Sequence, residues 1–405
     1  MKKGWISNRL GAITTKIGSG ATPRGGQESY KETGTPLIRS LNVHDWGFKE
    51  VKLARIDATQ AAQLSNVIVE PDDVLLNITG ASVARCCVAA PEFLPARVNQ
   101  HVSIIRPRKD EILSAFLQYL LISQTYKDQL LHTGEVGSTR QAITKAQIQD
   151  FVIEYPKSLA EQQRLVGILD EAFAGLATAK ATAEKNLQNA RALFESHLHS
   201  VFSQRGKGWV EKSLEELGTI TSSKRIFASE YVTTGVPFYR TKEIKQLANH
   251  REITTELFIS KSRYKEIKTS FGVPQEGDIL LTAIGTIGEI WVVEGDDDFY
   301  FKDGNVLWLK EFASVNPRFL KYVLMSFVES LNKMAHGSAY SALPIQRLNA
   351  HRVFLPPPRE QEEIAAKLDA LSTETQRLAS LYQQKLVALE ALKKSLLHQA
   401  FSGAL

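Results

Sequence analysis

The chain contains one pattern twice. The segment GSTRQAITKAQIQDFVIEYP, which begins at Gly137, aligns with GSAYSALPIQRLNAHRVFLP, which begins 200 positions later at Gly337. A second pair, LHSVFS from Leu198 and LHQAFS from Leu397, has nearly the same spacing. The repeat is about half of the 405 residues, far longer than the roughly 20–50 residues of a solenoid repeat, so it predicts a duplicated domain with its connecting segment. Two similar surfaces in one covalent frame suit the reading of two sites on one extended ligand, for which DNA is the leading candidate.

Length and composition are those of a globular protein of two to three domains, with 43% hydrophobic and 23% charged residues. No apolar run approaches the ~20 residues that cross a membrane. The N-terminal MKKGWISNRLG lacks the apolar segment of a signal peptide. The two cysteines, Cys86 and Cys87, are neighbours, which disfavours both a disulfide and a metal site. We therefore expect buried thiols, no membrane contact and a cytoplasmic location.

The periodicity of apolar residues divides the chain into four segments. Residues 1–157 and 206–357 read as short strands and turns followed by a shorter helical piece, which is typical of a mixed α+β domain. Residues 158–205 and 358–405 instead carry apolar residues at coiled-coil spacing, with Lys180, Thr375 and Lys385 interrupting the seam. Helices of about 40–45 residues need a packing partner, so we expect them to lie antiparallel against each other. The predicted fold is two similar α+β domains joined by two long antiparallel coiled-coil helices with pseudo-twofold symmetry, which would hold the domains a fixed distance apart.

Positive charge is concentrated outside the predicted helices. Residues 1–157 hold 19 basic and 15 acidic residues, and residues 206–357 hold 19 and 18, whereas basic and acidic residues balance in both helical segments. Within the second domain, residues 219–272 hold 10 basic and 5 acidic residues. Such a local excess suits a phosphate-binding face, although a mixed solvated surface explains the charge equally well.

Several paired segments carry a resemblance to a known family. They are GTPLIRSLNV with GVPFYRTKEI, PDDVLLNITGAS with QEGDILLTAIGT, NQHVSIIRP with DGNVLWLK, and a junction in which a strand ends at Pro156 or Pro356 before Glu161-Gln162 or Glu360-Gln361 opens a helix. In order and in repetition, these segments resemble the specificity subunit of type I restriction-modification systems over essentially the whole chain. The family architecture is a target-recognition domain, a long helix, a second target-recognition domain and a second long helix.

The resemblance implies a DNA-binding subunit without its own catalytic site or cofactor. Each target-recognition domain would read one half of a bipartite double-stranded DNA site, and the helices would hold two modification (methyltransferase) subunits. Two restriction (helicase-nuclease) subunits can join such a complex. S-adenosylmethionine, ATP and Mg would then belong to those partner subunits.

The sequence itself lacks the motifs of an enzyme of this kind. It has neither a G-x-x-x-x-G-K-[ST] phosphate loop nor an Asn/Asp-Pro-Pro-aromatic methyltransferase motif. Asp170-Glu171-Ala172-Phe173 imitates a helicase box within a predicted coiled coil, and Glu70-Pro71-Asp72-Asp73 imitates a nuclease metal site. We interpret the first as coincidence and the second as turn residues. The alternatives are a non-enzymatic two-lobed scaffold without DNA binding, and a stand-alone DNA nuclease or methyltransferase.

The candidate DNA-binding residues are Arg, Lys, Asn, Gln, Ser, Thr and a few others in polar loops, because these types donate to phosphates or pair with base edges. Any one of them can instead satisfy a local turn. In the first domain they are Thr22, Arg24, Gln27, Arg39, Asn42, Asn77, Thr79, Ser82, Arg85, Asn99, Gln100, His101, Ser138, Arg140 and Gln141. In the second domain they are Ser223, Lys224, Arg225, Arg240, Thr241, Lys242, Thr282, Thr286, Lys302, Asp303, Asn305, Ser338, Tyr340 and Ser341.

Two further features of the repeat carry predictions. Trp5 and Trp209 occupy equivalent places, which indicates a core anchor in each domain rather than a base-stacking residue. The segments that we expect to read bases, SGATPRGGQESYKETGTPLIRS and TSSKRIFASEYVTTGVPFYRT, differ strongly. Different loop chemistry on one scaffold predicts two unlike half-sites, and hence a non-palindromic target.

Overall fold

The structure, a computed structural model, describes residues 2–135, 142–204, 206–327, 343–402 and 404–405. The chain forms two compact units. The first unit contains residues 1–184 and 384–405, and the second contains residues 185–383. Each unit therefore combines one α+β lobe with parts of two long helices.

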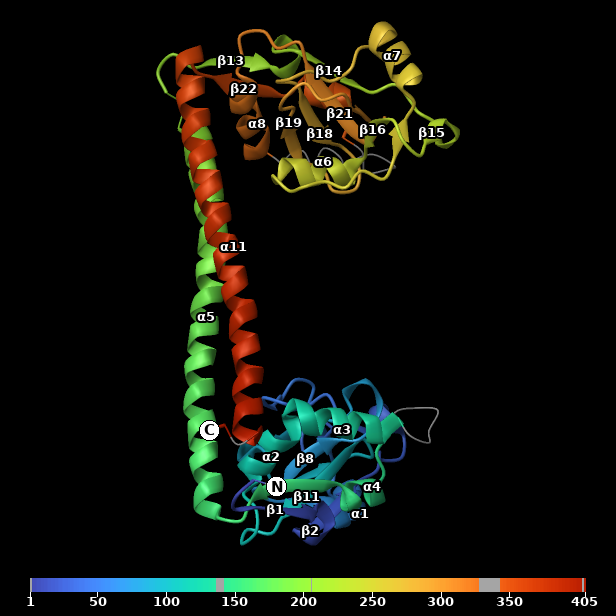
Figure 1. The fold of residues 1–405 in the computed structure, drawn as a ribbon, viewed down its shortest axis with the longest axis vertical. Helices are drawn as coiled ribbons and strands as arrows, with labels where there is room; N and C mark the ends of the chain where they lie inside the picture. The colour runs from blue at the N-terminus through green and yellow to red at the C-terminus, as the bar shows by residue number, and fades with distance from the viewer. Residues whose placement is uncertain (1, 136–141, 205, 328–342, 403) are drawn as a thin grey trace. The chain divides into compact units, whose positions relative to one another are not determined.

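Each unit is built on the same four-stranded antiparallel sheet. The first unit has the strand order β2-β11-β8-β9, and the second has the matching order β14-β21-β18-β19. Figure 1 shows α2 beside β8 in the first unit, and α6 and α8 flanking β19 in the second. The strands are β2 (Thr14–Ser19), β11 (Val102–Pro107), β8 (Val74–Asn77) and β9 (Cys86–Val88), and β14 (Thr219–Ser222), β21 (Val306–Lys310), β18 (Ile279–Thr282) and β19 (Ile290–Val292).

A second four-stranded sheet in each unit contains one parallel pair. Its order is β6-β3-β10-β7 in the first unit and β15-β17-β16-β20 in the second, with β3 and β10 parallel, as are β16 and β20. The strands are β6 (Ala54–Ile56), β3 (Thr35–Ile38), β10 (Ala96–Val98), β7 (Ile68–Val69), β15 (Tyr231–Val232), β17 (Phe258–Ile259), β16 (Val236–Tyr239) and β20 (Tyr300–Phe301). A two-stranded ribbon closes each lobe next to a long helix, formed by β1 (Trp5–Arg9) with β12 (Val152–Pro156) and by β13 (Val210–Ser213) with β22 (Arg352–Leu355).

The shorter helices differ more between the units than the sheets do. In the first unit, the short hairpin of β4 (Val43–His44) and β5 (Gly47–Phe48) packs on β9. In the second unit a helix, α6, packs on the equivalent strand, β19. The helices of the lobes are α1 (Ala58–Gln63), α2 (Ser114–Ile122), α3 (Gln124–Glu135) and α4 (Lys145–Asp150), and α6 (Thr241–Ala248), α7 (Lys261–Ser270), α8 (Pro317–Ser326) and α10 (Ile345–Asn349).

The two long helices have the lengths that the apolar spacing predicts. They are α5 (Leu159–Ser203) and α11 (Pro358–Ser402), with 45 residues each. In the first unit, the N-terminal part of α5 shares a buried cluster with Leu397 and Ala400 of α11. In the second unit, Leu198 near the end of α5 is buried with Leu368 near the start of α11. Within each unit the helices thus pack antiparallel, as predicted for a coiled coil.

One buried glutamine fixes the start of each long helix to its lobe. The Gln162 side chain donates to the carbonyls of Pro156 (2.9 Å) and Glu111 (3.0 Å) and accepts from the Leu113 backbone N–H (2.9 Å). Gln361 does the same in the second unit, with Pro356 (2.9 Å) and the Asn316 N–H (2.8 Å). α2 and α8 begin at these N–H groups. The glutamine of the repeated Glu-Gln junction therefore connects the last strand of the lobe, the lobe helix and the long helix by hydrogen bonds.

The structure confirms that the two tryptophans are core anchors and that the two cysteines are buried. Trp5 packs on Phe116 with a ring-centroid distance of 6.4 Å, and Trp209 packs on the equivalent Phe319 at 6.4 Å. Both cysteines are free and buried, and burial raises the pKa of Cys87 to about 12. These thiols are structural core residues with little thiolate character.

Candidate nucleic-acid interface

The candidate site in the first unit lies at one edge of the β2-β11-β8-β9 sheet. Because neighbouring strands are antiparallel, the end of β2, the start of β11 and the end of β8 meet at this edge. The Thr22 hydroxyl donates to the Gln100 side chain, whose amide lies 3.1 Å from the His101 ring. The other ring nitrogen of His101 contacts the Thr79 hydroxyl. The edge therefore presents one connected polar surface assembled from three loops.

The close approach of two of these loops requires a glycine. A Cβ added to Gly20 would lie 1.8 Å from the Val98 carbonyl oxygen, whereas a Cβ on Gly18 would meet nothing within 4 Å. The Gly20 N–H also donates to the Asn99 carbonyl at 3.1 Å. Gly20 thus holds the loop that carries Thr22 against the loop that carries Gln100.

Three predicted residues near this edge have side chains that are free to bind a ligand. Arg24 is exposed, and Ser82 and Arg85 are partly exposed in the turn after β8. None of the three makes a side-chain hydrogen bond or ion pair with a residue that the structure describes. Gln27 lies in a 3-10 turn next to Arg24, and Ser138, Arg140 and Gln141 fall outside the described residues.

Other predicted residues of the first unit serve the loops themselves. Asn42 is fully buried and holds the β4–β5 region through the Lys49 carbonyl at 2.8 Å. Asn77 is fully buried against the Ser40 carbonyl, and Asn99 accepts from the His101 N–H at 3.0 Å. The Arg39 guanidinium donates to the Lys52 carbonyl. These side chains are occupied in the structure, so we assign them a supporting role.

The connected groups at the equivalent edge of the second unit are charged, whereas those of the first unit are neutral. Arg225, in the loop after β14, pairs with Asp303 in the loop before β21 at 2.8 Å, and Lys302 lies 3.4 Å from the same carboxylate. Lys224 is exposed, with its amine 4.7 Å from the centre of the Phe271 ring. Ser223 is committed to the Phe301 carbonyl at 2.7 Å. The edge thus joins the same loops as in the first unit with different chemistry.

The remaining predicted residues of the second unit divide into three groups. Arg240 bonds to Glu243 (2.8 Å) and Glu256 (2.9 Å), and these hydrogen bonds raise its pKa. Lys242 shares Glu256, and the buried Thr282 hydroxyl closes its own turn on the Thr286 carbonyl, so these charges and this hydroxyl are already used. Thr241 and Asn305 are partly exposed and Thr286 is exposed, whereas Ser338, Tyr340 and Ser341 fall outside the described residues.

Sequence reasoning missed one feature of this edge. A pocket of about 270 Å³ lies beside Lys224, with Phe271, Trp308 and Lys310 in its wall. Phe271 is 49% exposed at the end of α7, and the Lys310 amine lies 4.5 Å from the centre of the Trp308 ring. The sequence signal was weak, because an aromatic residue after a helix normally indicates core. Two lysines beside aromatic rings give this pocket the chemistry of a nucleotide contact.

Both motif imitations contain side chains with structural partners, and the second lies in a turn, as predicted. Asp73 is fully buried and pairs with Arg106 at 2.7 Å, and it accepts from the Glu70 N–H in a turn. Asp170 accepts from the Tyr119 hydroxyl at 2.6 Å. Among the described residues, no group of three or more His, Cys, Asp or Glu side chains is placed to hold a metal ion. In the same part of the chain, no helix is long and apolar enough to cross a membrane.

A family of known proteins matches both halves of the chain. The family described as the type I restriction modification DNA specificity domain matches residues 2–188 and again residues 206–385. The chain belongs to this family. Its members are specificity subunits of type I restriction-modification systems and have no catalytic activity of their own, which excludes the stand-alone nuclease or methyltransferase.

Relatives and solved structures agree with this assignment along the chain. The specificity subunit of the Escherichia coli type I restriction enzyme EcoBI is 22% identical, over 99% of this chain and 86% of that protein. A putative specificity subunit from Haemophilus influenzae is 25% identical over 68% of this chain and 69% of its own length. The HsdS subunit of Thermoanaerobacter tengcongensis has the same fold, with a TM-score of 0.65, 20% identity and coverage of 100% of this chain and 98% of that chain. A chain from a type I restriction-modification system studied for its complex assembly gives a TM-score of 0.77 at 19% identity, covering 99% and 98%.

Proposed function

We propose that each unit reads one half of an asymmetric, bipartite double-stranded DNA site through the sheet edge described above. The main support for this proposal is that the equivalent edges of the two units present different chemical groups. The first offers the hydroxyl, amide and imidazole groups of Thr22, Gln100 and His101, and the second offers Lys224 with the Arg225–Asp303 pair. Neutral donor–acceptor groups and cationic groups recognise different base edges, so the two half-sites should differ.

The proposed contacts divide into two kinds. Arg24, Arg85 and Lys224 make no ion pair with a described residue and are suited to phosphates, which position a protein on DNA. Gln100, His101 and Arg225 lie in the connected clusters and are suited to base edges, where each good bidentate contact discriminates by about 1–3 kcal/mol. Gln27, Ser82, Thr286, Lys302 and Asn305 complete the proposed interface, together with the predicted residues outside the described ranges, which are Ser138, Arg140, Gln141, Ser338, Tyr340 and Ser341.

The first test is the methylated sequence in a host that carries the complete system. Methylome sequencing should show a split motif with two unlike halves, and one continuous palindrome would contradict the proposal. The second test is DNA affinity as a function of salt. Replacing Arg24 or Lys224 with alanine should lower the slope of log affinity against log salt by about 1, because each substitution removes one charge from a phosphate. Matched controls are Arg9→Ala, which removes an arginine paired with Asp150, and Lys261→Ala on α7; both should leave the slope unchanged.

We further propose that the long helices hold two modification subunits, and that two restriction subunits join the complete system. Exposed apolar side chains on the helices support this assembly, because contact with a partner would remove their apolar surface from water. Val387 and Leu392 are 64% and 47% exposed in the first unit, and Leu193 and Leu381 are 53% and 48% exposed in the second. S-adenosylmethionine, ATP and Mg would be bound by the partner subunits, and the assembly would work in the cytoplasm.

Co-expression with the modification subunit tests the assembly. The full chain should co-purify with two copies by light scattering, and Val387→Asp together with Leu381→Asp should reduce that number. A chain that stays alone at high concentration would contradict the assignment of partners.

A further inference from the structure

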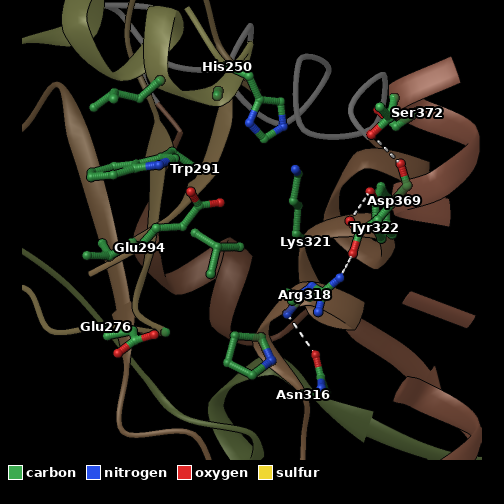
Figure 2. Close-up of a pocket in the computed structure, with 17 residues that line it drawn as sticks. His250, Glu276, Trp291, Glu294, Asn316, Arg318, Lys321, Tyr322, Asp369 and Ser372 are labelled. Carbon is green, nitrogen blue, oxygen red and sulfur yellow. Dashed lines mark hydrogen bonds and ion pairs between the residues drawn. The ribbon is translucent and has the colours of Figure 1, made fainter. Parts of the chain in front are cut away.

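The second unit contains a pocket of about 430 Å³ on the side of its lobe that faces α11. Figure 2 shows the side chains that line it, which come from the end of α6, the edge strand β19, the helix α8 and the helix α11. Trp291 forms one wall, and Tyr322, Asp369 and Ser372 form the opposite one. The size is within the range of pockets that take a ring-sized group.

One charged side chain of this pocket, Lys321, has an amine that is free to meet a ligand. Its side chain points into the open space (Figure 2), and it makes no hydrogen bond or ion pair with any residue described in the structure. Its amine lies 5.4 Å from the centre of the Tyr322 ring, and burial lowers the pKa of that amine. The neighbouring Arg318 and Tyr322 are both committed to Asp369. The carboxylates of Asp369 and Glu294 attract this amine without bonding to it. An incoming carboxylate that bonds to the amine directly would give the half-buried charge the hydrogen-bonded partner that it lacks.

The first unit fills the equivalent position with its own chain. The bonds of Gln162 and Gln361 align α2 with α8, so Gln118 corresponds to Lys321 and Tyr119 to Tyr322. The Gln118 amide donates to the Asp45 carbonyl oxygen at 3.1 Å, in the turn between β4 and β5. The next residue, Trp46, packs on Phe173 of α5 with a ring-centroid distance of 5.2 Å.

The second unit has neither the hairpin nor the aromatic residue that fills this space in the first unit. Its α6 replaces the hairpin, and Ser372 stands on α11 where Phe173 stands on α5. The pocket is therefore the space that the Asp45-Trp46 turn occupies in the first unit, where Gln118 meets the Asp45 backbone carbonyl and the Asp45 carboxylate pairs with Lys127. A lysine stands in place of the glutamine in the second unit, and its charge favours an anionic group at that position. Glu276 and Glu294 line the pocket but are exposed, so water screens their repulsion of a carboxylate more than it screens Lys321.

We propose that this pocket receives a turn of a partner subunit that carries a carboxylate side chain next to an aromatic side chain. The carboxylate pairs with Lys321, and the aromatic ring lies between Trp291 and Ser372. The inference rests on the proposed function in one respect, since the partner is a subunit of the same assembly. The peptide occupant follows from the repeat, because a peptide turn fills the matching space in the first unit.

A peptide tests the pocket without the assembly. A cyclised, dye-labelled hairpin containing VHDWGF, the sequence of residues 43–48, is titrated with the full chain by fluorescence anisotropy. We expect Lys321→Glu to weaken binding at least tenfold and Lys321→Gln, which restores the residue type of the first unit, to weaken it severalfold. Lys367→Glu, the same charge change at an exposed site on α11, should alter it less than twofold. A peptide with lysine in place of its aspartate should bind at least tenfold more weakly.

Crosslinking tests the occupant in the assembled complex. A photoreactive p-benzoylphenylalanine replaces Ser372, or Gln376 as an exposed control outside the pocket, and crosslinked peptides are identified by mass spectrometry. Ser372 should capture one partner segment in which Asp or Glu adjoins Phe, Tyr or Trp. Peptide binding that is indifferent to Lys321→Glu, a captured segment without that pair, or a small molecule released from the pocket would overturn the inference. If no complex forms, the proposed assembly fails, and the peptide titration still decides the chemistry of the pocket.

Discussion

The two units agree where lobe meets helix and differ one helical turn away. Gln162 and Gln361 make the same buried hydrogen bonds, and Tyr119–Asp170 is repeated as Tyr322–Asp369. Next to these pairs, however, a hairpin that seals the first unit is replaced in the second by α6 and an open pocket. The two units thus share the residues that join each lobe to its long helix, and they differ where we propose that a ligand binds. This pattern is typical of one fold that hosts different binding sites.

The largest expected effect comes from breaking the part that the units share. Replacing Gln361 with alanine leaves a buried N–H and a buried carbonyl without partners, which costs about 1–3 kcal/mol per group. We expect Gln361→Ala to lower the free energy of unfolding by about 3 kcal/mol, and Gln162→Ala to do the same. Urea unfolding followed by hydrogen exchange should place each effect in its own unit. Gln163→Ala, on the exposed face of α5, should change stability by less than about 0.5 kcal/mol.

The next largest effect concerns a residue that distinguishes the sheet edge of the first unit from that of the second. Gly20 corresponds to Ser223 in the second unit, where the side chain bonds to the Phe301 carbonyl. Gly20→Ser would force a Cβ into the Val98 carbonyl, which should cost about 2–3 kcal/mol in the way that overpacking does. It should also weaken DNA binding, because Thr22 would move away from Gln100. Gly18→Ser is the matched control, since a Cβ there meets open space. Equal stability of the two variants would contradict the close approach.

The hairpin that fills the position of the pocket in the first unit should contribute less to the free energy of unfolding. The Trp46 ring is 49% exposed and lies between Phe173 and the Lys393 amine, which is 3.3 Å from its centre. We expect Trp46→Ala to cost about 1–2 kcal/mol. A double-mutant cycle with Lys393→Met should give a coupling of about 0.5–1 kcal/mol, because the amine is only partly desolvated. Zero coupling would mean that the lysine only covers the ring.

How much of the fold could be predicted from the sequence depends on how far along the chain the signal for each element extends. The long helices follow from apolar spacing that extends over 45 residues, and the predicted segments 158–205 and 358–405 enclose both of them. The junction glutamines were recognisable because the Glu-Gln pair is repeated. By contrast, SLNVHDWGF and TKEIKQLAN sit at the same place in the repeat, and the choice between hairpin and helix depends on what each packs against.

The candidate interface was harder to predict for a different reason. Asn42 and Asn99 occur in polar turns and Asn77 directly before one, as Arg24 and Gln100 also occur in polar turns, and composition does not distinguish them. An asparagine that satisfies buried carbonyls and one that faces solvent have the same sequence pattern, because turns favour this residue type in both cases. Trp46 and Phe271 were missed because aromatic residues usually indicate core.

The smallest expected effect concerns the acidic residue that follows the same turn in each lobe. Asp73 pairs with the Arg106 guanidinium, whereas its counterpart Asp278 accepts from the neutral Trp308 indole N–H at 2.8 Å and from the Gln275 N–H at 2.9 Å. Burial raises the pKa of Asp278 above the ordinary aspartate value of 3.8. A raised carboxyl pKa means that the folded state binds the proton more tightly than the unfolded state does. The corresponding stability is complete below that ordinary value and is lost as pH rises through the raised pKa.

The variant Asp278→Asn keeps the shape and the acceptor oxygen but cannot ionise. Its stability relative to the natural chain should therefore increase as pH rises from about 4 through the raised pKa and then stay constant. Thermal midpoints at half-unit pH intervals measure this difference, which we expect to be at most a few degrees. Asp73→Asn should instead lower the thermal midpoint of the chain at neutral pH, because it leaves the Arg106 guanidinium without its buried anionic partner. A difference between Asp278→Asn and the natural chain that stays constant over this pH range would contradict the raised pKa of Asp278.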